Sequence, residues 1–348
     1  MICSWTRRRV AAVAILALVL PGVAQAQRIK LATLVPDGSI WDRSLKEMGA
    51  TWRADTKGRV KLDIFAGGVA GDEDDMVRKL RIGQIQACLF TASGLGQIEP
   101  AFNVFEIPML FESDAEIEFV LDGIKADFEK RLESQGYVML HWAHAGWMHV
   151  FSSKPIESYD DFERLKHFVW GGGTRVAKWY EELGIRTVPL SAPDVQTGLQ
   201  TGLVDVVPST PLAALSLQWF RTAPYMFERR LAPLVGGTVV SERVWRKISD
   251  ADKTALLAAA KKAEERIFRD VPQDELEALK EMQNRGLTVT KIKTEDLERW
   301  QALAAHFKQR MRANSVPRDA FDAVDALLKE FRAQNEATPD GTSSGKGG

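Results

Sequence analysis

The first part of the chain alternates short apolar runs with amphipathic segments. Strands are predicted where apolar runs reach strand length, at 28–35, 59–65 and 86–93. Between them, apolar residues spaced three and four apart predict helices over 42–57 and 72–82, which end at Gly58 and Gly83. This alternation predicts a mainly parallel sheet flanked by helices, whose loops at the carboxyl ends of the strands face a ligand.

The middle of the chain repeats this pattern. A long charged helix over 114–136 leads into an extended segment, 137–153, which ends at the turn Lys154-Pro155. A second α/β unit follows, with strands at 166–170, 185–190 and 203–211 and helices over 174–184 and 191–202. Two such units joined by extended crossings predict two lobes with a cleft at their interface.

The carboxyl third is predominantly helical. Residues 249–331 form long amphipathic patterns rich in Ala, Glu, Lys and Arg, with one strand-like interruption at 286–293. The last residues, 333–348, have the composition of a flexible tail that cannot form a core. The whole pattern therefore predicts an α/β protein with long C-terminal helices.

The amino terminus has the features of a secretory signal peptide. Arg7 to Arg9 precede an apolar run over 10–20, and the run leads into Ala24-Gln25-Ala26. We expect cleavage before Gln27 and export to the periplasm. The alternative, an uncleaved anchor, is disfavoured because the apolar run is too short to span a bilayer.

Composition narrows the function further. Acidic and basic residues nearly cancel, with 46 Lys and Arg against 47 Asp and Glu, and there is no basic stripe. This balance argues against nucleic acid as a partner. The mature chain keeps Cys88 alone, because Cys3 leaves with the signal peptide, so we expect no internal disulfide and a buried, inert thiol. Ten tryptophans are the unusual feature.

Catalytic motifs are weak. His141, His144 and His149 could in principle hold a metal, which leaves a metal-dependent periplasmic enzyme as an alternative. On a strand, however, the first two point to opposite faces, and the third lies about 26 Å from the first at about 3.3 Å per residue. No Gly-x-Ser-x-Gly elbow is present. We therefore predict no enzyme activity, no cofactor and no metal, and a binding protein fits better than an envelope scaffold.

A glycine run offers a different kind of site. Gly171, Gly172 and Gly173 follow a strand and precede a helix, but Val176 stands where a dinucleotide-binding fingerprint needs its third glycine. These glycine amides, together with Arg175, could instead hold a carboxylate or phosphate at the helix N-terminus.

At this point, ordered phrases of the chain resemble the solute-binding proteins of TRAP transporters, the DctP type. The resemblance runs from about Arg28 to Phe331. Its phrases are IKLATLVPDGSIWDRSLKEM, GRVKLDIFAGGVAGDEDDMVRKLRIGQIQACLF, IPMLF, FSSKPIESYDDFERLK and ELGIRTVPLSAPDVQTGLQTGLVD. Each phrase is weak alone, and their succession in family order is specific.

The resemblance implies a two-domain, type II-like periplasmic binding fold that closes around a ligand, and a partnership with a small and a large TRAP membrane subunit. The domain boundaries that we predict are a signal peptide over 1–26, a first domain over 27–147 and 235–273, a second over 148–234 and 274–335, and a disordered tail over 336–348.

The chain departs from the family at three polar positions. In members that bind organic acids, an arginine after the Leu-Lys pair, here 165–166, pairs bidentately with the ligand carboxylate, and Phe168 stands in its place. Met148 replaces a second arginine, and Ser209 or Thr210 replaces an asparagine. If this placement is shifted by a residue, Arg175, His167 or Lys166 instead binds the ligand's anionic group.

These departures predict a hydrophobic or amphipathic ligand, for example a fatty-acid-like molecule, because an unpaired buried carboxylate costs several kcal/mol. Relatives of this kind, without the arginine, are associated with a tetratricopeptide-repeat protein, which the resemblance implies as an additional partner. The predicted ligand-binding residues are Trp41, Thr91, Trp142, Trp147, Met148, Phe168, Trp170, Ser209, Thr210 and Trp219. The organic-acid alternative uses Gly171, Gly172, Gly173 and Arg175, and for any single tryptophan an ordinary place in the core is about as probable.

Overall fold

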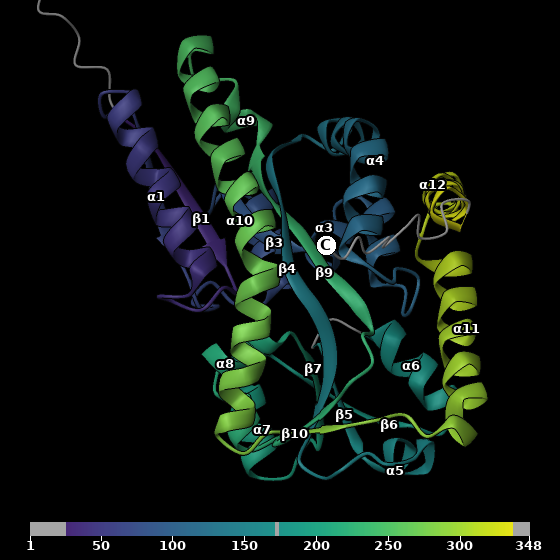
Figure 1. Ribbon diagram of the computed structural model, residues 1–348. Helices are drawn as coiled ribbons and strands as arrows, with labels where there is room; N and C mark the ends of the chain where they lie inside the picture. Colours follow the sequence, from purple (N-terminus) through teal and green to yellow (C-terminus); the bar gives the residue numbers. More distant parts are fainter. Residues whose placement is uncertain (1–25, 171–173, 337–348) are drawn as a thin grey trace, which may run out of the picture.

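The computed structural model describes residues 26–170 and 174–336, which form two lobes (Figure 1). The predicted signal peptide, the predicted glycine anion site and the end of the predicted tail lie outside the described residues. The strands are β1 (Gln27–Thr33), β2 (Val60–Phe65), β3 (Ala87–Thr91), β4 (Tyr137–Ser152), β5 (Lys166–Trp170), β6 (Arg186–Leu190), β7 (Val206–Ser209), β8 (Tyr225–Phe227), β9 (Ala232–Ser241) and β10 (Thr288–Thr290).

Helices connect and cover these strands. The α-helices are α1 (Ile40–Asp55), α2 (Glu73–Arg81), α3 (Ala92–Gly96), α4 (Asp114–Ser134), α5 (Tyr159–Arg164), α6 (Thr174–Glu182), α7 (Val195–Gln200), α8 (Pro211–Ser216), α9 (Glu242–Trp245), α10 (Asp250–Asn284), α11 (Leu297–Asn314) and α12 (Arg318–Glu336). Short 3₁₀ helices are η1 (Pro100–Glu106), η2 (Ala192–Asp194), η3 (Trp219–Arg221) and η4 (Thr294–Asp296). The predicted elements are present, with ends shifted by a few residues.

The strands follow the order β2-β1-β3-β9-β4-β7-β5-β6. The outer pairs, β1 with β2 and β3 and β5 with β6 and β7, are parallel. The central pairs, β9 with β3 and β4, and β4 with β7, are antiparallel. The sheet is therefore mixed, and the predicted α/β fold class is confirmed.

Strand β4 belongs to both lobes. Its first part pairs with β9 in the first lobe, and its last residues pair with β7 in the second. The β4–β9 pairing shifts register between His144 and Trp147, around Gly146, which has a φ of +95°. Glycine suits this bulge because other residues rarely adopt such a φ.

Helix α10 spans the two lobes beside this crossing (Figure 1). It packs against α1 of the first lobe and α8 of the second, as well as against β4. The helix begins at Ser249, whose hydroxyl accepts from the Asp252 amide, and it carries Pro272 in its interior. A proline there removes one helical hydrogen bond, so the helix has a weak point between its two packing partners.

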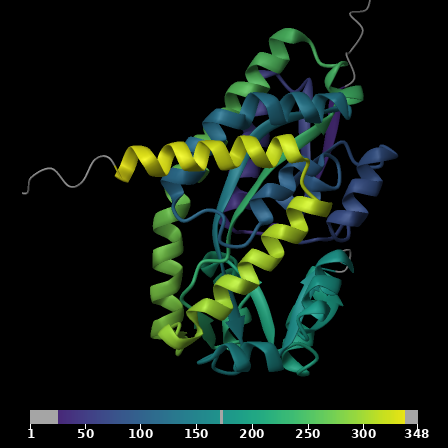
Figure 2. The same ribbon diagram turned by 90° about the vertical axis from the view of Figure 1, so that its right-hand side faces the viewer.

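Helices α11 and α12 cover another side of the molecule (Figure 2). Helix α12 packs on α4 of the first lobe: the Phe331 and Phe119 rings lie 5.3 Å apart, and Arg332 pairs with Glu116. The predicted boundaries place this helix in the second domain, and these contacts draw it to the first lobe instead. The chain thus crosses between lobes once more than predicted.

Each lobe has its own apolar core. In the first lobe, the Trp142 ring stacks on Phe102 at 5.3 Å and Phe128 completes the cluster. In the second, Phe151 and Phe220 are among the buried side chains under the sheet. Within residues 26–170 and 174–336, no helix has the length and hydropathy to span a membrane.

Candidate functional site

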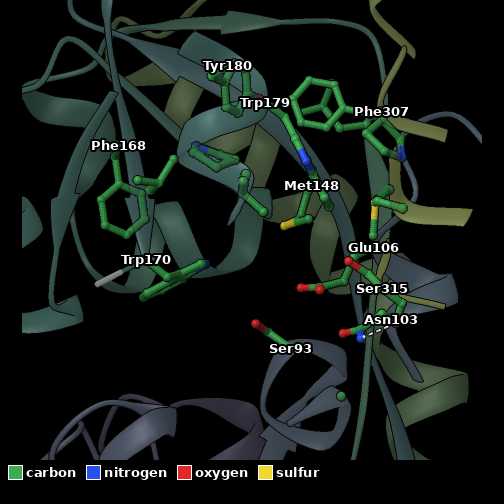
Figure 3. Close-up of a pocket in the computed structure, with 18 of the residues that line it drawn as sticks. Ser93, Asn103, Glu106, Met148, Phe168, Trp170, Trp179, Tyr180, Phe307 and Ser315 are labelled. Carbon is green, nitrogen blue, oxygen red and sulfur yellow. Dashed lines mark hydrogen bonds between the residues drawn. The ribbon is translucent and has the colours of Figure 1, made fainter. Parts of the chain in front are cut away.

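A cavity of about 380 Å³ lies where the two lobes meet (Figure 3). This volume is at the lower end of the usual range for small-molecule pockets. The described residues that line it are Asp74, Ser93, Gly96, Gln97, Asn103, Glu106, Pro108, Met148, Phe168, Val169, Trp170, Val176, Trp179, Tyr180, Pro208, Leu231, Ala232, Phe307, Met311 and Ser315. They come from both lobes, so a ligand held there would contact each of them.

The topology brings these distant segments together. Strand β4 carries Met148 across from the first lobe, and β5 carries Phe168 and Trp170 at its carboxyl end. The carboxyl ends of parallel strands are the usual place for ligand contacts in α/β folds. Helix α11 closes the cavity with Phe307, which lies far along the chain from the other walls.

Two groups of aromatic rings line the cavity, Phe168 with Trp170 on one side and Trp179, Tyr180 and Phe307 on another (Figure 3). The Phe168 and Trp170 rings meet edge to face at 4.8 Å, and the Tyr180 and Phe307 rings do so at the same distance. Trp179 packs against Phe307 as well. Edge-to-face pairs of this kind hold each other in place, so these rings are already in position before a ligand binds.

One carboxyl points into the cavity. Figure 3 shows the Glu106 side chain directed into the open space, with the Ser93 hydroxyl nearby. Burial and the neighbouring Glu73 raise the pKa of Glu106 to about 7, and the Ser93 hydroxyl acts in the opposite direction. Its carboxyl is thus divided between neutral and charged forms near neutral pH.

Glu73 lies behind this group and is fully engaged. Its carboxylate accepts from the Thr91 amide at 2.6 Å and from the Thr91 hydroxyl at 2.7 Å. Burial raises the pKa of Glu73. A side chain on Gly94 would collide with it, since a Cβ there would lie 2.9 Å from the Glu73 carboxyl carbon. The carboxyls of Glu73 and Glu106 thus lie near each other, and the lack of a side chain at Gly94 leaves room for Glu73.

The remaining polar groups at the edge of the cavity are bound to one another. Asn103 donates to the Ser315 carbonyl at 2.9 Å, and Gln97 donates to Asp74. Asp74 is exposed, whereas Glu106 is half-buried. No Lys or Arg is among the described lining residues. The charge that the described walls present to a ligand is therefore negative or neutral.

Three of the predicted ligand residues share this cavity. Met148, Phe168 and Trp170 all line it, the first two at the positions where the resemblance expects arginines. Of these, Phe168 is buried, and Trp170 is partly exposed. Their contact with a ligand stays a prediction. The Gly171 to Gly173 loop lies outside the described residues, as does the side chain of Arg175.

Two predicted tryptophans are held elsewhere by their own hydrogen bonds. Trp142 donates from Nε1 to Glu129 at 2.8 Å within the core of the first lobe. Trp147 donates from Nε1 to Asp114 at 2.7 Å, with the Arg230 guanidinium over its ring. Neither is among the described lining residues, because both rings pack inside the first lobe.

The other predicted residues also lie away from the described lining. Trp41 and Trp219 are buried in the apolar clusters of the first and second lobes. Thr91 hydrogen-bonds Glu73, as above. Thr210 caps α8, where its hydroxyl accepts from the Ala213 amide at 3.2 Å, and Ser209 donates to the Thr210 carbonyl. The hydroxyl groups of Thr91, Ser209 and Thr210 are thus used to build the fold.

The three histidines do not converge on a point. His141 contacts the Trp142 carbonyl and the Thr238 hydroxyl, and His149 contacts the Phe227 carbonyl. Burial lowers the pKa of both, and it lowers the pKa of His144 to about 4. In the part of the chain that the structure describes, no three His, Cys, Asp or Glu residues gather as a metal site.

Several lining residues escaped the sequence analysis. Glu106 and Ser93 carry no motif, and Phe307 reaches the cavity from a C-terminal helix whose partners cannot be read from the sequence. Trp179 and Tyr180 had a usable signal, because they lie on one face of an amphipathic helix next to a predicted strand. The sequence thus found the strand side of the cavity and missed its helical side.

Comparison with known proteins identifies the family to which this chain belongs. The family model described as bacterial extracellular solute-binding protein, family 7, matches residues 31–314. A solute-binding protein of Chromohalobacter salexigens is 26% identical over 66% of this chain and 67% of its own length. The 2,3-diketo-L-gulonate-binding periplasmic protein YiaO of Escherichia coli is 24% identical over 67% of this chain and 72% of its own.

A solved structure supports the fold. The sugar acid binding protein DctPAm of Advenella mimigardefordensis, in complex with galactonate, has a TM-score of 0.80 to this chain. It is 19% identical, and the alignment covers 88% of this chain and 99% of that one. At this identity the likeness establishes the shared two-lobed architecture.

Proposed function

We propose that this chain, which belongs to the bacterial extracellular solute-binding proteins of family 7, captures a small molecule between its lobes and passes it on unaltered. Its receiver would be a TRAP-type permease with a small and a large membrane subunit. The periplasm is the compartment that the predicted signal peptide and the periplasmic relatives support. A tetratricopeptide-repeat partner, implied by the resemblance alone, is a further prediction for co-purification to test.

The ligand is mainly hydrophobic or amphipathic in this proposal. The observation that carries it is the composition of the cavity: aromatic and aliphatic side chains dominate, and the described lining holds no Lys or Arg. A carboxylate transferred to such walls loses hydration worth several kcal/mol without a partner. An apolar group instead gains about 25 cal/mol for each Å² removed from water.

A second candidate is a small organic acid. It is favoured by the relatives, since YiaO is named for 2,3-diketo-L-gulonate and DctPAm was solved with galactonate. In this chain, its carboxylate would be held by the amides of Gly171 to Gly173 and by Arg175. Calorimetric titration with galactonate tests this candidate: Arg175→Ala should abolish binding if it holds, and no heat should appear in either protein if it fails.

The leading proposal is tested by native mass spectrometry of the exported protein, purified without denaturation from cells grown on rich medium. We expect a co-purified amphipathic molecule that is released on unfolding. Recovery of a sugar acid or dicarboxylate, with no lipid-like species, would contradict the hydrophobic assignment while leaving the transport role intact.

A further inference from the structure

Glu106 is the carboxyl directed into the cavity (Figure 3). The polar lining also includes Ser93, Gln97 and Asn103. Asp74 supplies a second, exposed carboxylate at the edge. Among the described lining residues, the charged side chains are those of Glu106 and Asp74, so a cation bound near Glu106 would meet negative charge there.

Cations suit the remaining walls too. Phe168, Trp170, Trp179, Tyr180 and Phe307 surround the cavity with π-systems. The faces of such rings attract organic ammonium groups, most strongly where water is excluded. A carboxylate ligand would bind weakly in such a cavity, because the Glu106 carboxylate repels an anion and the aromatic rings offer it no partner.

We infer that the cavity selects amphipathic amines, whose ammonium group pairs with Glu106 and whose apolar body lies against Phe168, Trp170 and Phe307. This inference rests on the proposed function and names its ligand class. It differs from a fatty-acid-like ligand only in the head group, and the difference is a full reversal of charge.

Glu73 favours a cation over a neutral hydroxyl. Its carboxyl lies behind Glu106 and disfavours a second unpaired negative charge there. An ammonium group offsets that repulsion when Glu106 ionises, since its charge stabilises both carboxyls. A ligand hydroxyl would donate a hydrogen bond but leave the repulsion in place, so we expect an alcohol to bind more weakly than the matching amine.

The test compares octylamine, octanol and octanoate by calorimetric titration of the full mature protein at pH 8, after bound ligand has been removed by reversible unfolding. We expect octylamine to bind at least about tenfold more tightly than octanol, and octanoate to be the weakest of the three. Tight binding of octanoate would overturn the amine assignment but support the amphipathic proposal. Failure of all three would count against both.

Matched variants identify the residue responsible. Glu106→Gln keeps the size and one acceptor oxygen but removes the charge, and should weaken octylamine about tenfold or more while changing octanol less than threefold. Glu99→Gln is the control, because Glu99 lies next to the same 3₁₀ helix, caps the Ala101 amide and is not part of the described lining. Equal weakening by both variants, or none by Glu106→Gln, would refute the pairing with Glu106.

Discussion

Two glutamates in this molecule share a raised pKa and differ in what satisfies them. Burial raises the pKa of both Glu106 and Glu275 to about 7. Glu275, on α10, accepts from the Trp147 amide at 3.0 Å and from the Leu212 amide at 3.1 Å. Glu106 has no such amide partner among the described residues, and it lines the cavity.

The difference separates a structural acid from a binding acid. Glu275 lies on α10, the helix that spans both lobes, and its two oxygens bind β4 at the crossing and the start of α8. Both oxygens are therefore used. Among the described residues, no backbone amide occupies the Glu106 carboxyl, which leaves its oxygens for the proposed ligand. A raised pKa alone does not distinguish these roles, and the hydrogen-bond partners do.

The largest expected effect is at the bulge beside Glu275. Gly146→Ala should lower the free energy of unfolding by about 2 kcal/mol or more, because its φ is +95° and the new Cβ would lie 2.2 Å from the Glu275 carboxyl carbon. Gly136→Ala is the control, with a φ of +85° and nothing within 4 Å of the added atom. Urea unfolding measures both, and equal losses would show that the contact with Glu275 is unimportant.

A smaller difference should separate the two acids themselves. Glu275→Gln should lower the free energy of unfolding by about 1–3 kcal/mol, since the amide nitrogen cannot accept from a second backbone N–H. Glu106→Gln should stay within about 0.5 kcal/mol of the parent protein, because no backbone amide among the described residues donates to its carboxyl. Thermal and urea denaturation provide the comparison, and a destabilised Glu106→Gln would mean that Glu106 is also structural.

Part of the fold and of the cavity could be predicted from the sequence. Alternating periodicity placed the strands and helices, and the ordered family phrases placed Met148 and Phe168, which both line the cavity. The sequence analysis did not find either glutamate: Glu275 lies on an amphipathic helix, where carboxylates are usually solvated, and Glu106 belongs to no motif. Periodicity also cannot tell whether a tryptophan such as Trp142 fills the core or a cleft, since both environments are apolar.

The smallest expected effect is the number of protons released when the ligand binds. An ammonium ligand requires ionised Glu106, so binding of octylamine at pH 7 should release about half a proton, given a pKa of about 7. Affinity should fall about tenfold from pH 8 to pH 6, because acid protonates the carboxyl before the ligand can pair with it. The other titratable groups at the site are Glu73 and Asp74 from α2 and Tyr180 from α6.

Calorimetry in two buffers of different ionisation enthalpy gives that count. Glu106→Gln should bring the release close to zero, whereas Glu275→Gln should leave it unchanged. A release that persists without Glu106 would assign the proton to another group and weaken the contrast between the two acids.

The position of the ligand between the lobes is the central prediction, and a crystal structure of the protein with its natural ligand measures it directly. We predict electron density for an apolar body between Phe168, Trp170 and Phe307, with its polar end at Glu106. Density for a carboxylate against the Gly171 to Gly173 loop and the Arg175 guanidinium would contradict the account.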